Sequence, residues 1–406
     1  MIDEPIQDIS TVGVVGAGTM GAGIAQVAAE ASLAVLMFDP VEGATGRARG
    51  RIAGFLERKV EKRQMTAEDV AAAAARISSV ASLDELAAAD LVIEAIPEDL
   101  ELKRETFRRL DALTQRAILA SNTSSLSIAR IAAGTTGPER VVGMHFFNPV
   151  PLMALVEVIA GPLTAPRVVD SVALLARQLG KTPVVAADTP GFIVNRVQRA
   201  LYLEAYRIFE EGAAEVAAID DAMRRIGFRL GPFELADVVG TDVNLAAGEA
   251  IFAGFYGEPR YRPAQVQRRV VDAGRLGRKA GAGYYDYESD GARGAPWRLL
   301  RRPEGGPRVA TLDAAQIEAR ILAAIVNEAA SAVADGVAAP EAVDTAMRLG
   351  TNWPEGPLAW GERIGLASVT GTLDALHAGV PDGRYRVTPL LRAVADQGAS
   401  FFADQA

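Results

Sequence analysis

A glycine-rich turn near the N-terminus places the strongest constraint on the fold of this chain. The turn reads Gly16-Ala-Gly18-Thr-Met-Gly21, and it follows an apolar, β-branched run at 11–15 and precedes a segment of helical composition at 22–31. In such a unit the first glycine permits the tight turn, the second lets the backbone approach a pyrophosphate, and the third lets the helix lie against the strand. The helix N-terminus adds free N–H groups for phosphates. The pattern therefore predicts a dinucleotide-binding strand–turn–helix unit.

The acid that such a site needs is Asp39, about 20 residues beyond the turn and at the end of a second strand candidate at 34–39. A carboxylate there accepts hydrogen bonds from the adenosine ribose hydroxyls and repels a 2′-phosphate, which favours NAD over NADP. The alternative is a glycine turn that serves packing alone, with an incidental capping acid.

Composition removes several other classes of protein. The 406 residues include 42 Lys and Arg against 51 Asp and Glu, for a formal charge of −9, and they include no cysteine and two histidines. We therefore expect no disulfide, no metal site and no cysteine nucleophile, and the negative charge argues against a nucleic-acid partner. Met1–Ser10 has no signal-peptide pattern and no apolar run is long enough to span a bilayer, so we expect a soluble cytoplasmic protein without a membrane partner.

Strand-like and helix-like segments alternate through the first half of the chain. This alternation predicts a mostly parallel sheet with helices on both faces. From Thr189 onward helical patterns take over, which places a domain boundary near 187–189. The strand candidates are 11–15, 34–39, 91–96, 118–121, 141–146, 154–160 and 184–187, and the main helix candidates are 22–31, 41–75 (as one or two helices), 100–114 and 193–211.

His145 is the candidate for acid–base chemistry. It lies in an apolar strand, and the turn Asn148-Pro-Val-Pro151 separates that strand from the next, which carries Glu157. A turn of this length predicts an antiparallel pair at the edge of the sheet, where the two side chains can meet. A buried carboxylate fixes the tautomer and orientation of an imidazole base, and beside a nicotinamide such a base suits alcohol oxidation. A lone histidine satisfied within the core is the alternative.

Two polar segments complete the candidate site. Ser121-Asn-Thr-Ser-Ser125 follows a strand candidate, at the sheet edge where ligands bind in such folds. Pro190-Gly-Phe-Ile-Val-Asn-Arg196 opens the long helix candidate. For the serine-rich segment, an N-cap of the following helix is an equally good interpretation.

The two halves of the C-terminal region repeat each other. Leu203-Glu-Ala205 corresponds to Asn327-Glu-Ala329, and Arg260-Tyr-Arg262 corresponds to Arg384-Tyr-Arg386, in an ordered series with an offset of 124 or 125 residues. This predicts a tandem duplication of a helical domain. A Gly-, Pro- and Arg-rich stretch at 288–310 separates the copies and has the composition of a connector.

Four motifs occur together in this chain: the glycine turn, Ser121-Asn-Thr-Ser-Ser125, His145-Phe-Phe-Asn-Pro-Val150 and Thr189-Pro-Gly-Phe-Ile-Val-Asn-Arg196. In this order they resemble the L-3-hydroxyacyl-CoA dehydrogenases, over about residues 10–287. The tail, from about 311 to 400, resembles the second C-terminal domain of longer members. Among these the chain looks most similar to bacterial 3-hydroxyadipyl-CoA and 3-hydroxybutyryl-CoA dehydrogenases, which serve fatty acid β-oxidation and phenylacetate catabolism.

The resemblance implies a Rossmann-type α/β NAD-binding domain at 1–188. Two tandem all-α domains of the 6-phosphogluconate dehydrogenase C-terminal type would follow at 189–287 and 311–406, with 288–310 as the linker. The implied activity is NAD-dependent oxidation of an L-3-hydroxyacyl-CoA thioester to the 3-oxoacyl-CoA. The alternatives are oxidation of a small free 3-hydroxy acid and a non-catalytic protein that binds NAD or acyl-CoA.

The resemblance also implies roles for matching positions. His145 would be the general base with Glu157 as its partner, and Ser124 and Asn195 would contact the reacting oxygen or the thioester end of the substrate. Lys62 or Arg63 would hold the CoA phosphates, although a solvated helix face explains basic residues equally well. The implied cofactor contacts are Gly16, Gly18, Thr19, Met20, Gly21, Asp39, Glu98, Lys103, Asn148 and Lys279.

The second copy departs from the family pattern. At the constant offset Asn195 falls on Ala319 and Thr189-Pro-Gly191 falls on Asp313-Ala-Ala315, so we expect this copy, with His377, to be structural. It could replace a partner chain and make a pseudo-dimer within one monomer, or the protein could be a homodimer. A substrate with a terminal carboxylate would need a cation, for which the sequence offers Arg196, Arg199 or Arg229.

Overall fold

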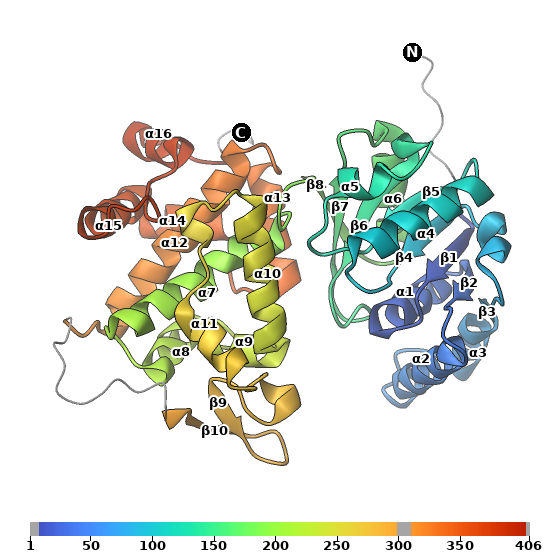
Figure 1. Ribbon diagram of the computed structural model, residues 1–406, viewed down its shortest axis with the longest axis horizontal. Helices are drawn as coiled ribbons and strands as arrows, with labels where there is room; N and C mark the ends of the chain where they lie inside the picture. The colour runs from blue at the N-terminus through green and yellow to red at the C-terminus, as the bar shows by residue number, and fades with distance from the viewer. Residues whose placement is uncertain (1–7, 299–309, 403–406) are drawn as a thin grey trace. The chain divides into compact units, whose positions relative to one another are not determined.

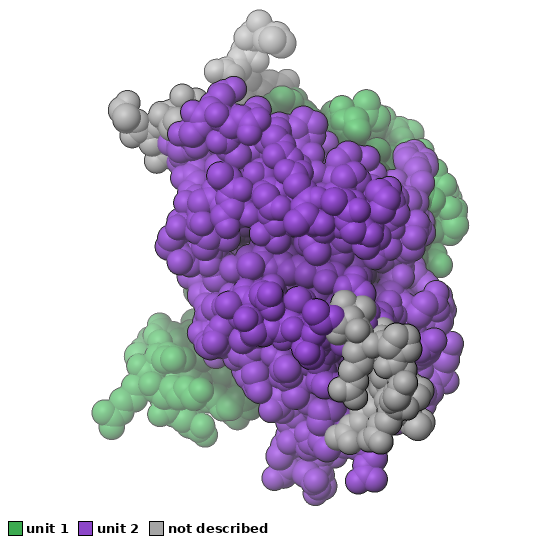
Figure 2. Space-filling view, turned by 90° about the vertical axis from the view of Figure 1, so that its left-hand side faces the viewer, with its two compact units in different colours: residues 1–192 green, residues 193–406 purple. Residues whose placement is uncertain are grey.

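The computed structural model describes residues 8–298 and 310–402, and it divides the chain into two compact units, Met1–Phe192 and Ile193–Ala406 (Figure 2). Each unit is described by itself. The N-terminal residues 1–7 and part of the expected connector, 299–309, lie outside the described residues. Within the part of the chain that is described, no helix is both long and apolar enough to cross a membrane.

The first unit is built on an eight-stranded sheet with strand order β3-β2-β1-β4-β5-β6-β7-β8 (Figure 1). All neighbouring strands pair in parallel except β6 and β7, which are antiparallel. The strands are β1 (Thr11–Val15), β2 (Ala34–Phe38), β3 (Ile77–Ser79), β4 (Leu91–Glu94), β5 (Ile118–Ser121), β6 (Val141–Phe146), β7 (Leu155–Ala160) and β8 (Thr182–Ala187).

The mostly parallel sheet and the antiparallel β6–β7 pair are as the sequence predicts, but the placement of that pair at the edge is wrong. β8 pairs in parallel with the outer side of β7 and forms the edge itself. The helix that carries the chain from β7 to β8 was not predicted. It is α6 (Pro166–Gln178), which makes a crossover connection of the kind that parallel strands require.

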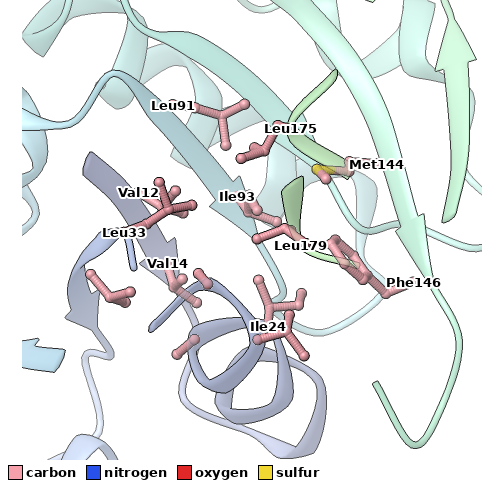
Figure 3. Packing of buried hydrophobic residues seen from close by; sticks show 14 of the residues in the cluster. Val12, Val14, Ile24, Leu33, Leu91, Ile93, Met144, Phe146, Leu175 and Leu179 are labelled. Atoms are coloured by element: carbon pink, nitrogen blue, oxygen red, sulfur yellow. The ribbon is translucent and has the colours of Figure 1, made fainter. Parts of the chain in front are cut away.

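Helices cover both faces of the sheet. Val12 and Val14 of β1 pack with Ile24 of α1 and Leu175 of α6 in one core, which Figure 3 shows. A second core on the opposite face joins the sheet to α4 and α5. The other helices of this unit are α1 (Thr19–Glu30), α2 (Ala44–Glu61), α3 (Ala67–Ala75), α4 (Leu100–Leu113) and α5 (Ile128–Ala132).

Strand alternation decides which face the candidate base occupies. In β6 the side chains of Met144 and Phe146 belong to the first core, whereas Val141 belongs to the second. Successive side chains of a strand point to opposite faces, so His145 lies on the second face. The same alternation in β7 places Glu157 there, because Val156 and Val158 belong to the first core.

The second unit is helical, and the order of its helices occurs twice. The first series is α7 (Val194–Glu211), α8 (Val216–Arg225), α9 (Pro232–Val239), α10 (Thr241–Gly254) and α11 (Gln265–Asp272); the second is α12 (Ala314–Ala334), α13 (Pro340–Thr351), α14 (Pro357–Ile364), α15 (Leu366–Gly379) and α16 (Pro389–Gln397). The long helices α7 and α12 lie along one another (Figure 1).

Matching residues of the two series of helices form equivalent hydrogen bonds. Asp220 of α8 accepts hydrogen bonds from the first N–H groups of α9, and Asp344 of α13 accepts the equivalent bonds from α14. The glycine before each of these helices, Gly231 or Gly356, packs so closely that a Cβ would lie 2.3 Å from the aspartate. A side chain capping a distant helix recurs at the same offset, as a duplicated domain requires.

The expectation that strands end after the first unit does not hold completely. A short antiparallel pair, β9 (Tyr285–Tyr287) and β10 (Arg293–Pro296), follows α11, and β10 lies inside the stretch expected to be a plain connector. These strands are too short and too polar to show an alternating pattern in the sequence.

Candidate functional site

The candidate residues of the first unit gather at one edge of its sheet. The glycine turn follows β1, Asp39 follows β2, Glu98 lies beyond the end of β4, and the serine-rich segment follows β5. Because these strands are parallel, their carboxyl ends meet at the same edge, which is where ligands bind in such sheets. The order of the strands brings together residues that lie far apart in the sequence.

The glycine turn has the geometry that a dinucleotide site needs. Gly16 has φ of +100°, and a Cβ on it would lie 2.6 Å from the carbonyl oxygen of Ala95, so only glycine fits. A Cβ on Gly21 would lie 1.8 Å from the carbonyl oxygen of Gly16. At Gly18, by contrast, a Cβ would meet nothing within 4 Å. The two outer glycines close the turn, and the middle one faces open space where phosphates can approach the N-terminus of α1.

Asp39 is fixed beside this turn. Its two carboxylate oxygens accept hydrogen bonds from the backbone N–H groups of Ala17 (2.7 Å) and Val41 (2.8 Å). From α2, Arg51 donates to the carbonyl oxygen of Ala17 at 2.7 Å. The acid therefore has a defined position next to the phosphate-binding turn, as an adenosine ribose contact requires. Arg51 was not among the sequence candidates, because nothing in the local pattern of α2 points to the turn.

His145 and Glu157 are direct neighbours across the β6–β7 ladder. The Nδ1 atom of His145 lies 2.7 Å from Oε2 of Glu157, and the carboxylate side chain is fully buried. A carboxylate in this position accepts the Nδ1 proton of a neutral imidazole, which leaves Nε2 as the basic nitrogen. The predicted meeting of these two side chains is confirmed by this contact.

Aromatic rings enclose the imidazole. The ring centroids of Phe147 and Phe192 lie 4.5 and 6.0 Å from that of His145. The imidazole side chain keeps 8 % of its surface exposed, and within the described residues Nε2 makes no hydrogen bond. A base held at one nitrogen, walled by apolar rings and unpartnered at the other nitrogen, can accept a proton from a bound ligand.

Glu98 organises the serine cluster, which we define as residues 121–125. One of its oxygens, Oε1, accepts hydrogen bonds from the hydroxyl groups of Thr123 (2.6 Å) and Ser125 (2.9 Å), and from the backbone N–H groups of Ser124 and Ser125 (both 3.0 Å). Burial by itself would raise the pKa of Glu98, but the charge of Lys103 and the donors of the serine cluster hold this pKa below its usual value. The carboxylate thereby shapes the loop that presents Ser124.

The capping interpretation of the serine cluster does not describe this loop. The N-cap of α5 is Ser127, which lies outside the cluster, and Asp188 holds the same helix end by accepting from the Ser127 hydroxyl at 2.8 Å. The cluster contributes Asn122 instead, whose Oδ1 accepts from the backbone N–H of Phe146 at 2.8 Å. This bond links the cluster to the strand that carries His145.

A buried acid at the end of β4 was missed by the sequence reasoning. Glu94 accepts from the ammonium group of Lys103 (2.5 Å) and from the hydroxyl of Ser121 (2.7 Å), and it is fully buried. Lys103 is 1 % exposed and also lies 3.4 Å from Glu98. The lysine therefore neutralises two acids within the protein, and its direct contact with a cofactor stays a prediction. An acid at the end of an apolar strand was the available signal.

The remaining candidates are more exposed. Asn148 lies at the surface after β6, and Lys62 and Arg63 are exposed at the end of α2. In the second unit, Asn195 is half-buried in the first turn of α7, and the ammonium group of Lys279 binds both carboxylate oxygens of Asp242 at 2.7 Å. Their roles toward a ligand stay predictions.

Family models and relatives agree with this organisation. Residues 11–189 match the model described as "3-hydroxyacyl-CoA dehydrogenase, NAD binding domain". The C-terminal domain model of the same family matches twice, at 191–287 and at 317–400, which are the two segments related by the repeat.

Two curated relatives and a solved structure illustrate the similarity. The chain is 38 % identical to a 3-hydroxyadipyl-CoA dehydrogenase of Escherichia coli, over 95 % of this chain and 97 % of the relative. It is 44 % identical to a probable 3-hydroxybutyryl-CoA dehydrogenase of Bacillus subtilis, over 69 % of this chain and 98 % of the relative. A crystal structure titled as 3-hydroxybutyryl-CoA dehydrogenase from Escherichia coli matches with a TM-score of 0.87 and 38 % identity, covering 96 % of this chain and 99 % of that one.

Proposed function

The chain belongs to the 3-hydroxyacyl-CoA dehydrogenase family, and from that premise we propose that it oxidises an L-3-hydroxyacyl-CoA to the 3-oxoacyl-CoA with His145 as the general base. The observation that carries the proposal is the contact of 2.7 Å between His145 Nδ1 and the buried carboxylate of Glu157. The substrates we favour are 3-hydroxybutyryl-CoA and 3-hydroxyadipyl-CoA, the two named for the relatives described above.

The proton step uses the nitrogen that the protein leaves unpartnered. His145 Nε2 takes the proton of the substrate hydroxyl, and the resulting imidazolium is stabilised by Glu157 at the opposite nitrogen. The rings of Phe147 and Phe192 pack against the imidazole and reduce its contact with water, which strengthens its attraction to the carboxylate. NAD, when bound, supplies the acceptor for the hydride that leaves the same carbon.

The residues of the first unit fit NAD. Gly18 leaves open space at the N-terminus of α1, where the pyrophosphate would be held by backbone N–H groups. Asp39 would accept hydrogen bonds from the ribose hydroxyls and would repel the 2′-phosphate of NADP. Thr19, Met20 and Asn148 complete the proposed cofactor contacts of this unit, with Glu98 shaping the loop beside them.

Substrate contacts are assigned to Ser124 and Asn195, which would hold the reacting oxygen or the thioester carbonyl. Glu98 supports the first of these by binding the backbone N–H of Ser124 at 3.0 Å. Lys62 and Arg63 are exposed cations at the end of α2, and we propose that they attract the phosphates of coenzyme A. Lys279 is a further proposed cofactor contact, as the family resemblance implies.

A substrate panel tests the function. NADH formation should be followed on 3-hydroxybutyryl-CoA, on longer 3-hydroxyacyl-CoA thioesters and on free 3-hydroxybutyrate, with NAD and with NADP. We expect turnover of the thioesters with NAD. Turnover of the free acid alone would establish the small-acid alternative, and binding of NADH without turnover of any thioester would establish the non-catalytic one.

A further inference from the structure

Arg199 is a buried cation that the fold leaves without an anion. It lies on α7 in the second unit and is 4 % exposed. Its Nη1 donates to the backbone carbonyl oxygen of Asn244 at 2.9 Å, and its guanidinium group stacks over the ring of Tyr202 at 4.7 Å. Within the described residues, neither Nε nor Nη2 has a hydrogen-bond partner, and no carboxylate forms an ion pair with this side chain.

The other buried arginines of the described chain all have acids beside them. Arg140 pairs with Asp111, Arg196 pairs with Glu328, and both Arg207 and Arg320 pair with Glu204. Burying a charge without a counter-charge is unfavourable, so such groups in folded proteins are paired or bind a ligand. Arg199 is therefore the exception in a protein that otherwise pairs its buried cations.

The unpartnered edge of this guanidinium is the one that binds carboxylates. The Nε–H and Nη2–H bonds of an arginine point in the same direction, and together they form a fork that matches the two oxygens of a carboxylate. Nη1, on the other edge, is already used by Asn244. The fold thus holds Arg199 in place through Nη1, and the Nε–Nη2 edge remains available to a carboxylate.

The surroundings leave room beside this group. Gly248 of α10 lies next to Arg199, and a Cβ placed on it would meet only Nη1, at 3.6 Å, with nothing else within 4 Å. Glycine in a helix interior is less favourable than alanine, so its presence here needs a local reason. The open space that this glycine leaves lies beside Nη1, the nitrogen already bound to Asn244, and it keeps that side of the guanidinium uncrowded.

The position of Arg199 relates it to the proposed substrate contact Asn195. The two residues are four apart on α7, which places them on one face of the helix and about 6 Å apart along its axis. A chain that has its reacting end at Asn195 and runs along this face of α7 would bring its far end to Arg199. The other cations considered for this role fit less well, because Arg196 is bound by Glu328 and Asp335 and Arg229 is exposed.

We propose that Arg199 binds the terminal carboxylate of a dicarboxylyl substrate, so that the enzyme prefers 3-hydroxyacyl-CoA thioesters that carry a free carboxylate at the end of a short acyl chain, such as 3-hydroxyadipyl-CoA. This proposal rests on the proposed function above. It makes Arg199 a specificity-determining residue, which contacts the substrate remote from the reacting carbon.

The test compares 3-hydroxyadipyl-CoA with 3-hydroxyhexanoyl-CoA, which has the same number of acyl carbons and no carboxylate. In the unsubstituted enzyme kcat/KM should be higher for 3-hydroxyadipyl-CoA. In Arg199→Met this preference should fall by about 10- to 100-fold, the scale of losing a charge-assisted hydrogen-bonded pair, mainly through KM. Activity on 3-hydroxybutyryl-CoA, which does not reach Arg199, should be retained and shows that the variant is folded.

Two further variants sharpen the result. Arg199→Lys keeps the charge and loses the fork, so its preference should be intermediate. Arg229→Gln removes an exposed arginine of the same unit and should leave the preference unchanged. Equal kcat/KM for the two six-carbon thioesters in the unsubstituted enzyme, or equal losses on every substrate in Arg199→Met and Arg199→Lys, would overturn the proposal while leaving the proposed function intact. Absence of turnover on all thioesters would instead remove the proposed function.

Discussion

Arg196 of α7 donates from Nε to Glu328 of α12 at 2.7 Å, and both side chains are buried, at 1 % and 3 % exposure. The equivalent pair runs in the opposite direction, from Arg320 of α12 to Glu204 of α7. A tyrosine from the corresponding position of each copy, Tyr261 or Tyr385, also donates to the acid. The two copies therefore exchange the same interaction in both directions, as the two sides of a symmetric dimer interface do.

Glu328→Gln should be strongly destabilising. The carboxylate also binds Arg260 (3.3 Å), so its removal takes away the buried acid that two arginines share and leaves Arg196 with the half-exposed Asp335 alone. Breaking a buried pair in this way costs about 3–5 kcal/mol, and the urea midpoint should fall accordingly. The matched control is Glu355→Gln, whose partner Arg363 is 58 % exposed and whose effect should stay below about 1 kcal/mol. Equal effects of the two variants would contradict this account.

A chain that ends at residue 310 should lose solubility or should pair with itself, because it exposes the apolar and charged face of α7 that α12 now covers. Either outcome supports the view that the second copy acts as an internal partner. The measurement is size-exclusion chromatography with light scattering, together with activity on 3-hydroxybutyryl-CoA. A soluble monomer with unchanged stability and activity would show that the second copy is dispensable and reject that view.

His145→Ala should lower kcat by about 10²- to 10⁴-fold, the usual scale for removing a general base. Glu157→Gln should have a smaller effect, because the imidazole remains but loses its anionic partner. The double variant should be no slower than His145→Ala alone, since Glu157 acts through the histidine and the two losses are not additive. His377→Ala serves as the control and should retain full activity, which also tests the view that the second copy is structural.

Substitutions at two glycines of the phosphate-binding turn should distinguish an effect on cofactor binding from an effect on stability. Gly18→Ala places its Cβ in open space, so thermal stability should be unchanged while NADH binding, measured by fluorescence titration, weakens by at least about 10-fold. Gly21→Ala forces a Cβ against the carbonyl oxygen of Gly16 and should lower the melting temperature as well. Unchanged NADH affinity in Gly18→Ala would argue against pyrophosphate binding at this turn.

Acid should weaken the first unit through Glu98. The pKa of this carboxyl is below its usual value in the folded protein, so the unfolded chain takes up the proton more readily. The stabilisation is therefore present above the unfolded pKa of about 4.3 and is lost as the pH falls through the lower, folded pKa. Urea midpoints measured between pH 6 and pH 3 should fall less steeply in Glu98→Gln than in the unsubstituted protein. Parallel curves would contradict the assignment.

The local patterns of the chain were sufficient for much of the fold and for the centre of the site. The glycine turn, the strand–helix alternation and the short turn between β6 and β7 are properties of neighbouring residues, and they predict the parallel sheet and the meeting of His145 with Glu157. The repeated motifs likewise predict two equivalent series of helices. The strands that escaped prediction, β3, β9 and β10, are three or four residues long and show no alternation.

Sequence patterns were enough to identify the reactive and charged side chains and the helices and strands that carry them. Which of these charges have a partner became clear only from the folded structure. Arg196 is occupied because α12 lies along α7, and Arg320 pairs with Glu204 across the same contact. Three residues further along α7, Arg199 has the same chemistry and no acid. Ion pairing depends on contacts between elements that are distant in the sequence. It also depends on burial, because a buried charge without a counter-charge is unfavourable. The folded structure was therefore needed to distinguish an arginine that pairs within the protein from one that is available to a ligand.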